Sequence, residues 1–140
     1  MSGFLLDTNV VSDLRKARPN EGLVEWIDAV DESKLFLSVI TIGELRIGIE
    51  MQQDKKKRAD LETWLVSDLM ERFEGRILPF DLSVAERWGR IEGRARSGSG
   101  KLPVVDSFTA ATAIHHDLTL VTNNESDFAR TGAAVLNPWS

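Results

Sequence analysis

Four acidic residues stand beside short apolar segments, and their positions suggest one shared site. Asp7 directly follows an apolar run of strand-like length, while Glu44 and Asp106 lie near the starts of segments with helical spacing. Asp127 follows a later apolar run. Carboxylates held close together repel each other, and their pKa values rise unless a cation neutralises them. Carboxylate oxygens favour Mg²⁺ or Mn²⁺ over zinc, and such ions support the hydrolysis of phosphodiester bonds.

The first two acids also have structural explanations. Asp7 could be a turn residue at the end of a strand, with Thr8 or Asn9 as the N-cap of the next helix. Glu44 could form a capping box with Thr41, which would place it in the first turn of its helix. These explanations require no shared site.

The two later acids are equally open to a structural reading. Asp106 stands at a helix start, where the helix dipole stabilises any acidic side chain. Asp127 lies in a polar stretch over 122–128, where neighbouring Glu125 could take its place. The four acids taken together favour a metal site more strongly than any one of them does.

Strand-like and helix-like segments alternate along the chain, and this order decides where the acids can meet. Short apolar runs predict strands at 3–6, 35–37, 76–78, 118–121 and 134–136. Apolar residues at helical spacing predict helices over 10–16, 21–30, 42–50, 54–73, 83–96 and 104–116. Strands joined by helices imply a mainly parallel, four- to five-stranded sheet that is covered on both faces. Ligands bind such sheets at the carboxyl edge, where all four acids can converge.

The composition predicts a single domain spanning residues 1–140. Hydrophobic residues make up 42% of the chain and charged residues 28%, which suits a packed core and excludes general disorder. The absence of cysteine excludes disulfides, thiolate metal sites and cysteine nucleophiles. We find neither a signal peptide nor an apolar run of the ~20 residues that span a bilayer. We therefore expect a cytoplasmic protein with no membrane contact.

The net charge of −5 argues at first against nucleic-acid binding, because such proteins are usually basic. If four of the 22 acids hold a metal ion, however, 18 remain against 17 basic residues, and local patches matter more than the total. Arg87, Arg90 and Arg94 share one face of a predicted helix and could follow an RNA backbone. The alternative is a solvated face, because Glu86 and Glu92 are interleaved with them.

Four stretches of the chain resemble PIN-domain ribonucleases of the VapC/FitB type, which are toxins of bacterial type II toxin–antitoxin systems. These stretches are Leu6–Val10, Thr41–Gly48, Asp106–Ala113 and Leu120–Phe128, and they follow the family's order across nearly the whole chain. The ending Asn137-Pro138-Trp139 is also similar. Asn123 departs from the family pattern, in which many members carry arginine, and this removes a positive charge beside the site.

The resemblance implies a PIN-like α/β/α sandwich and an endoribonuclease that depends on Mg²⁺ or Mn²⁺. The residues it assigns are the catalytic and metal-binding acids Asp7, Glu44, Asp106 and Asp127, and the supporting polar residues Asn9 and Thr122. It further implies a homodimer and a VapB/FitA-like antitoxin whose C-terminal segment covers the active groove. Operator DNA would be bound only through the complex with that antitoxin. The predicted helix over 54–73 is the best candidate for a protein interface.

Two other functions remain open on the residues alone. The first is a catalytically silent PIN-like module that binds RNA or protein, although an unneeded acidic cluster would cost stability. The second is a phosphohydrolase with Asp7 as its nucleophile. That chemistry expects a second aspartate two residues later, where this chain has Asn9.

Overall fold

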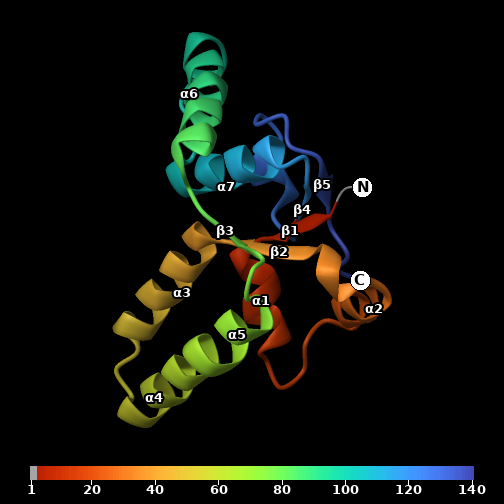
Figure 1. Cartoon of the computed structure of the whole chain (residues 1–140), viewed down its shortest axis with the longest axis vertical. Helices are drawn as coiled ribbons and strands as arrows, with labels where there is room; N and C mark the ends of the chain where they lie inside the picture. Colours follow the sequence, from red (N-terminus) through yellow and green to blue (C-terminus); the bar gives the residue numbers. More distant parts are fainter. Residues whose placement is uncertain (1–2) are drawn as a thin grey trace.

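A computed structural model describes residues 3–140 of the chain and shows one sheet with helices on both faces (Figure 1). The strands are β1 (Phe4–Leu6), β2 (Leu35–Ser38), β3 (Ile77–Leu78), β4 (Thr119–Val121) and β5 (Val135–Leu136). They pair in the order β3-β2-β1-β4-β5, and every pairing is parallel. The predicted parallel sheet is confirmed, including its fifth strand. The prediction that the chain has no signal peptide also rests on Met1 and Ser2, which lie outside the described residues.

The helical elements follow the predicted order along the chain. They are α1 (Thr8–Leu14), α2 (Glu21–Ala29), η1 (Glu32–Lys34), α3 (Val39–Met51), α4 (Lys55–Thr63), η2 (Trp64–Leu69), α5 (Met70–Arg72), α6 (Leu82–Ser97), α7 (Val104–His115) and η3 (Glu125–Phe128). None of the helices in this part of the chain is both long and apolar enough to cross a membrane.

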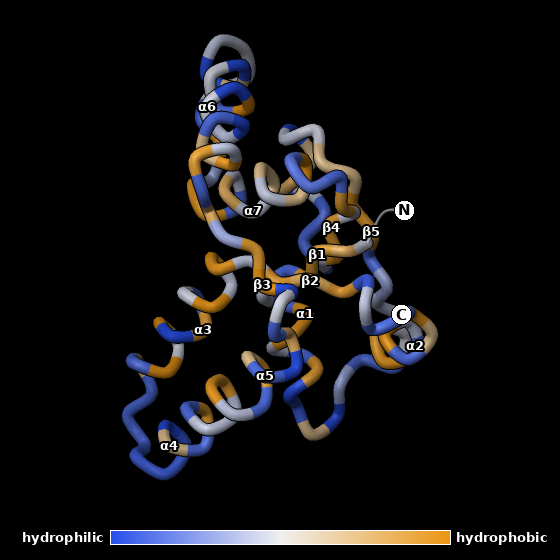
Figure 2. Tube along the Cα trace, viewed as in Figure 1, coloured by the Kyte–Doolittle hydropathy of each residue, from blue (hydrophilic) through white to orange (hydrophobic). Residues whose placement is uncertain are grey.

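The sheet separates two apolar cores, because successive side chains of a strand point to opposite faces. Leu6 belongs to the core beneath α1, α2, α3 and the helical run over 55–72. Leu5 points the other way and packs with Ala110 and Ala113 of α7. The small alanine side chains let α7 lie close to the sheet. Figure 2 shows the apolar strands at the centre, with more hydrophilic residues along α4 and the outer part of α6.

The predicted helix over 54–73 is present as one continuous helical run. Asp54 caps it by accepting hydrogen bonds from the main-chain nitrogens of Lys56 and Lys57, at 3.0 and 3.1 Å. Its middle section, η2, is a π-helix, which the apolar spacing did not predict. A π-turn inserts residues without ending a helix, so the apolar stripe continues through Leu65 and Leu69, both of which are buried.

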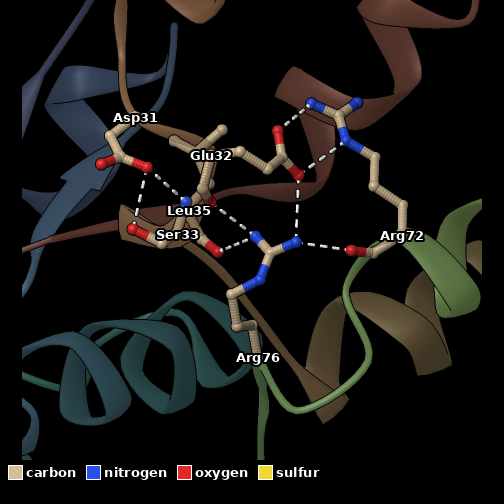
Figure 3. Close-up of polar contacts among 6 residues, drawn as sticks. All are labelled: Asp31, Glu32, Ser33, Leu35, Arg72 and Arg76. Atoms are coloured by element: carbon tan, nitrogen blue, oxygen red, sulfur yellow. Dashed lines mark hydrogen bonds and ion pairs between the residues drawn. The ribbon is translucent and has the colours of Figure 1, made fainter.

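A cluster of charged side chains connects the end of the helical run over 55–72 to the start of β2 (Figure 3). Arg72 donates two hydrogen bonds to the carboxylate of Glu32, at 3.0 and 2.8 Å. Arg76 donates to the main-chain oxygens of Glu32 and Leu35, at 2.7 Å each. Both guanidinium groups also lie over the ring of the buried Phe73. The network therefore ties together the segments that lead into β2 and β3.

Two helix starts differ from the predictions. Helix α1 begins at Thr8, and its N-cap is Asp7 rather than Thr8 or Asn9. Helix α3 begins at Val39, three residues earlier than predicted, because Ser38 accepts a hydrogen bond from the main-chain nitrogen of Thr41. Both strands therefore run directly into helices, without a loop between them.

Candidate active site

Asp7 lies at the carboxyl edge of the sheet, immediately after the central strand β1. Its main-chain nitrogen donates to the oxygen of Val121 at 2.9 Å, which extends the pairing of β1 with β4. Its carboxylate accepts from the main-chain nitrogen of Thr8 at 2.8 Å and thereby caps α1. Only 7% of the residue is exposed. The turn explanation is thus partly correct, but the carboxylate also takes part in further side-chain contacts.

The predicted supporting residues both contact this carboxylate. Thr122 directly follows β4, and the parallel register of β4 with β1 sets it beside Asp7. Its buried hydroxyl donates to Asp7 Oδ2 at 2.9 Å. Asn9 Nδ2 donates to Thr122 Oγ1 at 3.0 Å and to Asp7 Oδ2 at 3.3 Å. The main-chain nitrogen of Asn124 donates to Thr122 Oγ1 at 3.0 Å, which fixes the hydroxyl in place.

Glu44 is not part of a capping box, and the predicted pairing with Thr41 as a cap is wrong. Because α3 starts at Val39, Glu44 lies in the second turn, beyond the reach of the helix start. Its Oε1 instead accepts a hydrogen bond from the hydroxyl of Thr8 at 2.6 Å. The hydroxyl of Thr41 lies 3.1 Å from that of Thr8. Glu44 is therefore held toward the start of α1, beside Asp7.

Asp106 and Asp127 complete the group from the other side of β1. Asp106 lies in the first turn of α7, as predicted, and is partly buried. Asp127 lies in η3 and is exposed. The charge of Asp127 raises the pKa of Asp7, and the charges of Asp7 and Asp127 raise the pKa of Asp106. Glu125, the alternative to Asp127, instead accepts a hydrogen bond from Asn137 Nδ2 at 2.8 Å.

Electrostatic repulsion couples the four acids. The pKa of Asp106 is raised to about 6, first because burial removes water from its carboxylate. The negative charges of the other acids raise it further, in the order Asp7, Asp127 and Glu44. Burial also raises the pKa of Asp7, against the opposing effect of the hydrogen bond from Thr122. The pKa values of Asp7 and Asp106 thus stay raised, although the hydrogen bonds of Asp7 act to lower its own.

The donor chemistry of this site fits a hard divalent cation. Carboxylate oxygens are the preferred ligands of Mg²⁺ and Mn²⁺. Asn9 Oδ1 is also buried and, within residues 3–140, accepts no hydrogen bond, which leaves a further oxygen available. As arranged here, no three acidic or histidine side chains in this range stand close enough to hold one ion. Binding an ion would therefore require some of the carboxylates to turn inward.

Sequence reasoning overlooked three residues around the site. The sequence offers Thr8 and Thr41 as caps, whereas in the structure the hydroxyl of Thr8 donates to Glu44 and lies 3.1 Å from the hydroxyl of Thr41. Arg130 was overlooked altogether. Its guanidinium donates to Ser99 Oγ at 2.8 Å and to the main-chain oxygens of residues 100 and 101 at 3.1 and 3.2 Å. The Ser-Gly segment over 97–100 is therefore tied to the region that carries Asp127.

The three arginines of the predicted RNA contact lie exposed on α6. Arg90 pairs loosely with Glu86 at 3.7 Å, and both side chains are largely exposed. Arg87 and Arg90 line a hollow of about 250 Å³ with His115 of α7, while Arg94 does not. Glu92, which was expected on the same solvated face, is buried. None of the three arginines makes a charge contact with the four acids among the contacts of the described residues.

A larger hollow of about 330 Å³ opens beside Glu44. Thr8 and Glu44 form part of its wall, so it is continuous with the candidate active site. Most of its lining is apolar, and the side chains concerned are Leu45, Ile49, Leu61 and Trp64. Arg15, which lies 5.4 Å from the ring centre of Trp64, adds a positive charge. The helical run over 55–72 thus presents two of its apolar residues to this groove.

Comparison with known proteins identifies the family. Residues 4–134 match the family model described as the PIN domain. The chain is 38% identical over 136 residues to "Toxin FitB" of Neisseria gonorrhoeae, covering 97% of this chain and 98% of that protein. It is 35% identical over 136 residues to "VapC ribonuclease Y4jK" of Sinorhizobium fredii, covering 97% of each.

Solved structures show the same fold. The structure of FitAcB from Neisseria gonorrhoeae has a TM-score of 0.91 at 38% identity, covering 97% of this chain and 98% of that one. The structure of FitAB bound to an IR36 DNA fragment has a TM-score of 0.90 at 36% identity, covering 98% and 96%. The α/β/α sandwich expected from the sequence is confirmed. The chain belongs to the PIN-domain family, within the group that includes the FitB toxin and the VapC ribonucleases.

Proposed function

We propose that this protein is a Mg²⁺- or Mn²⁺-dependent endoribonuclease toxin that hydrolyses RNA phosphodiester bonds and is inhibited by a cognate antitoxin. The observation that carries the proposal is the gathering of four acids at one sheet edge, where burial, and then the charges of Asp7, Asp127 and Glu44, raise the pKa of Asp106 to about 6. A stable fold gains nothing from this repulsion, whereas a cation site uses it. The names of the relatives, a toxin and a ribonuclease, support the same reading.

The four acids Asp7, Glu44, Asp106 and Asp127 would hold the metal. A bound Mg²⁺ or Mn²⁺ would activate a water molecule for attack on phosphorus and stabilise the charge on the leaving oxygen. Thr122 and Asn9 orient the Asp7 carboxylate, because they donate to Oδ2. The hydrogen bond from Thr122 also opposes the rise in the pKa of Asp7 that burial causes. The hydroxyl of Thr8 orients Glu44.

The sequence argues against Asp7 as a nucleophile, because an aspartate-based phosphohydrolase expects a second aspartate two residues later and this chain has Asn9 there. The hydrogen bonds of Asp7 orient its carboxylate, since Oδ1 accepts from the nitrogen of Thr8 and Oδ2 accepts from Thr122 and Asn9. Oδ1 thereby keeps a lone pair for a cation. This favours a metal-assisted nuclease over an aspartate-based phosphohydrolase.

Cleavage of a mixed RNA pool by the antitoxin-free protein tests the proposal. We expect cutting with Mg²⁺ or Mn²⁺ and none with EDTA. Asp7→Asn and Asp106→Asn should each lower the rate by at least about a hundredfold, because a neutral amide binds the cation poorly. Asparagine is preferable to alanine at position 7 because it can still cap α1.

Asp68→Asn is the matched control, since Asp68 is an exposed acid of η2 outside the site. It should cut like the wild type, and all variants should retain the wild-type circular dichroism spectrum. Metal binding without cutting on any RNA would instead support a silent PIN-like module. Undiminished cutting by a folded Asp7→Asn protein would overturn the proposed mechanism.

The groove beside Glu44 is the proposed seat of the antitoxin. Its apolar wall suits an amphipathic segment, and its continuity with the acids would let that segment cover the active site. Gly48 lines the groove and has space around it, so Gly48→Trp would fill the seat. This change should abolish binding of a peptide from the C-terminal segment of a FitA-type antitoxin. Unchanged binding would exclude the groove.

The remaining partners follow from the same proposal. We infer a cytoplasmic homodimer whose complex with the antitoxin binds operator DNA, as the structure of FitAB with a DNA fragment suggests. We also retain Arg87, Arg90 and Arg94 as proposed contacts to the RNA backbone, because they form an exposed cationic face on α6.

A further inference from the structure

Two of the four acids have no side-chain donor to hold them in place. The carboxylates of Asp7 and Glu44 are each oriented by a threonine hydroxyl. Among residues 3–140, by contrast, no hydrogen bond holds the carboxylate of Asp106 or of Asp127. The positions of these two acids therefore depend on the main-chain segments that carry them, which are the start of α7 and the short helix η3.

The segment that leads to Asp106 is the loop between α6 and α7. Gly100 in this loop has a φ of +107°, which glycine adopts without strain, and its main-chain nitrogen donates to the oxygen of Ala95 at 2.6 Å. The following Leu102 is buried, and Pro103 is the N-cap residue of α7. The loop thus passes directly into the helix, so that a shift of the loop would move the helix start and its acid.

The segment that carries Asp127 is fixed to the core on one side only. Phe128 is buried and packs in the same core cluster as Ala110 and Ala113 of α7. Asp127 itself is exposed, and its main-chain nitrogen donates to the oxygen of Asn124 at 3.1 Å, which is a contact within the same turn. Burial of the phenylalanine therefore holds η3 against α7 but leaves its exposed side to other contacts.

Arg130 connects these two segments. Its Nη1 donates to Ser99 Oγ at 2.8 Å and to the main-chain oxygen of Gly100 at 3.1 Å. Its Nη2 donates to the main-chain oxygen of Lys101 at 3.2 Å. A guanidinium is planar and presents its N–H groups in a fixed fork, so the three contacts set the orientation of the loop as well as its distance.

We propose that Arg130 is a positioning residue of the candidate active site, which keeps the segments of Asp106 and Asp127 together so that both carboxylates can turn onto one divalent cation. The inference rests on the metal site of the proposed function and adds a residue to it. Arg130 lies three residues after Asp127, and Lys101 lies five residues before Asp106. Arg130 forms no ion pair with either acid in the described part of the chain, so it acts through the two segments.

The direction of the change in metal affinity separates positioning from charge. A positive charge near a cation site opposes binding of the cation. If Arg130 acted through its charge alone, its removal would strengthen metal binding or leave it unchanged. Loss of positioning would instead weaken binding, because ordering two loose segments around the cation costs conformational entropy.

Mn²⁺ binding to the full chain, free of antitoxin and RNA and measured by electron paramagnetic resonance, tests the proposal. We expect the dissociation constant to rise about tenfold in Arg130→Gln, as for other groups that support metal ligands. Arg130→Lys keeps the charge but lacks the fork, so it should also weaken binding, although by less. Unchanged or tighter binding in Arg130→Gln would overturn the proposal.

Arg76→Gln is the matched control. Arg76 also donates to main-chain oxygens, those of Glu32 and Leu35, but at the start of β2, which is the opposite edge of the sheet from the acids. This variant should lose stability and leave the Mn²⁺ affinity of the folded chain unchanged. Equal losses of affinity in Arg130→Gln and Arg76→Gln would indicate a general loosening of the fold and would refute a positioning role.

Hydrogen exchange in the metal-free protein provides a second measurement, which involves neither metal nor RNA. The main-chain N–H groups of Gly100 and Asp127 should exchange at least about tenfold faster in Arg130→Gln than in the wild type, and Arg76→Gln should not change them. Unchanged exchange at both groups would contradict the proposal even if Mn²⁺ binding fell. A wild type that binds no Mn²⁺ would refute the proposed function, and exchange alone would then decide whether Arg130 holds the two segments together.

Discussion

The carboxylate of Asp7 serves the fold and the candidate site together. It caps α1 through the nitrogen of Thr8, and it accepts side-chain hydrogen bonds from Thr122 and Asn9. Loss of an N-cap costs about 1 kcal/mol, so alanine at this position would weaken the fold as well as the site. Asp7 therefore has two roles, as the N-cap of α1 and as a carboxylate of the site. The choice between alanine and asparagine decides whether an experiment measures both roles or the second alone.

Asp106→Asn should stabilise the metal-free protein, and the gain should depend on pH. The pKa of Asp106 is about 6 in the fold and near 3.8 when unperturbed, so the folded chain keeps its proton to higher pH than the unfolded chain does. The wild type therefore loses stability as pH rises through this window, whereas the variant does not. We expect a gain of ~1 kcal/mol or less above about pH 7, since the side chain is partly exposed to screening solvent.

Urea unfolding in EDTA at about pH 4 and about pH 8 measures this difference. The variant and the wild type should be similar at the lower pH and should diverge at the higher one. Added Mg²⁺ should remove the divergence by stabilising the wild type. An equal difference at both pH values would show that repulsion among the acids is not its cause.

At the scale of elements, two tight strand-to-helix connections build the site. Strand β1 passes directly into α1 and β2 directly into α3, because Asp7 and Ser38 cap the following helices. Helix α3 is thereby rotated so that Glu44 reaches Thr8. The network around Glu32 supports this arrangement from the opposite edge, where it fixes the start of β2 (Figure 3).

Glu32→Gln should destabilise the protein by about 1 kcal/mol, because the two hydrogen bonds from Arg72 lose their charge. We expect no larger loss of stability, because 47% of the Glu32 side chain is exposed and solvent screens its charge. The hydrogen bond from Arg72 lowers the pKa of Glu32, so this stability is present above the ordinary pKa of 4.5 and is lost as pH falls below it.

Thermal unfolding at about pH 7 and about pH 3 checks this prediction. Glu71→Gln, a change at an exposed acid of α5, is the control and should be neutral at both pH values. A Glu32→Gln protein that differs from the wild type equally at both pH values would contradict the ionic origin of the contact.

At the scale of the whole molecule, the net charge of −5 conceals an uneven distribution. Negative charge gathers at the sheet edge that carries Asp7 and Asp106, while α6 carries an exposed cationic face. A polyanion approaching the protein would meet the arginines favourably and the acids only through a cation. The total charge therefore predicts little about RNA binding.

Arg87→Glu combined with Arg90→Glu should weaken binding of mixed RNA oligonucleotides and reduce the slope of log affinity against log salt by about 1 per lost contact. Lys55→Glu combined with Lys56→Glu is the control, since these lysines are exposed at the start of α4. Fluorescence anisotropy with the Asp7→Asn protein separates binding from cleavage. An unchanged slope would identify the arginine face as merely solvated.

The sequence by itself determined the order of the elements, the parallel sheet and the edge at which the acids lie. Apolar runs and helical spacing depend on local periodicity, which side chains such as Leu5 and Leu6 impose directly. A carboxylate after a buried strand, as at Asp7, likewise follows from neighbouring residues. The resemblance to the PIN family then named the candidate acids, because its motifs are contiguous stretches of chain.

Only the tertiary structure decided which side chains hold those acids. Thr8 and Glu44 are 36 residues apart in the sequence, and Asp7 and Thr122 are 115 residues apart. Local reasoning assigned Glu44 to a capping box, because a cap is the contact available nearby in sequence. It also missed the contacts of Arg130 with residues 99–101 and the burial of Glu92, since neither follows from neighbouring residues in the sequence. Chain proximity is readable from sequence, whereas these contacts depend on how the sheet and helices pack.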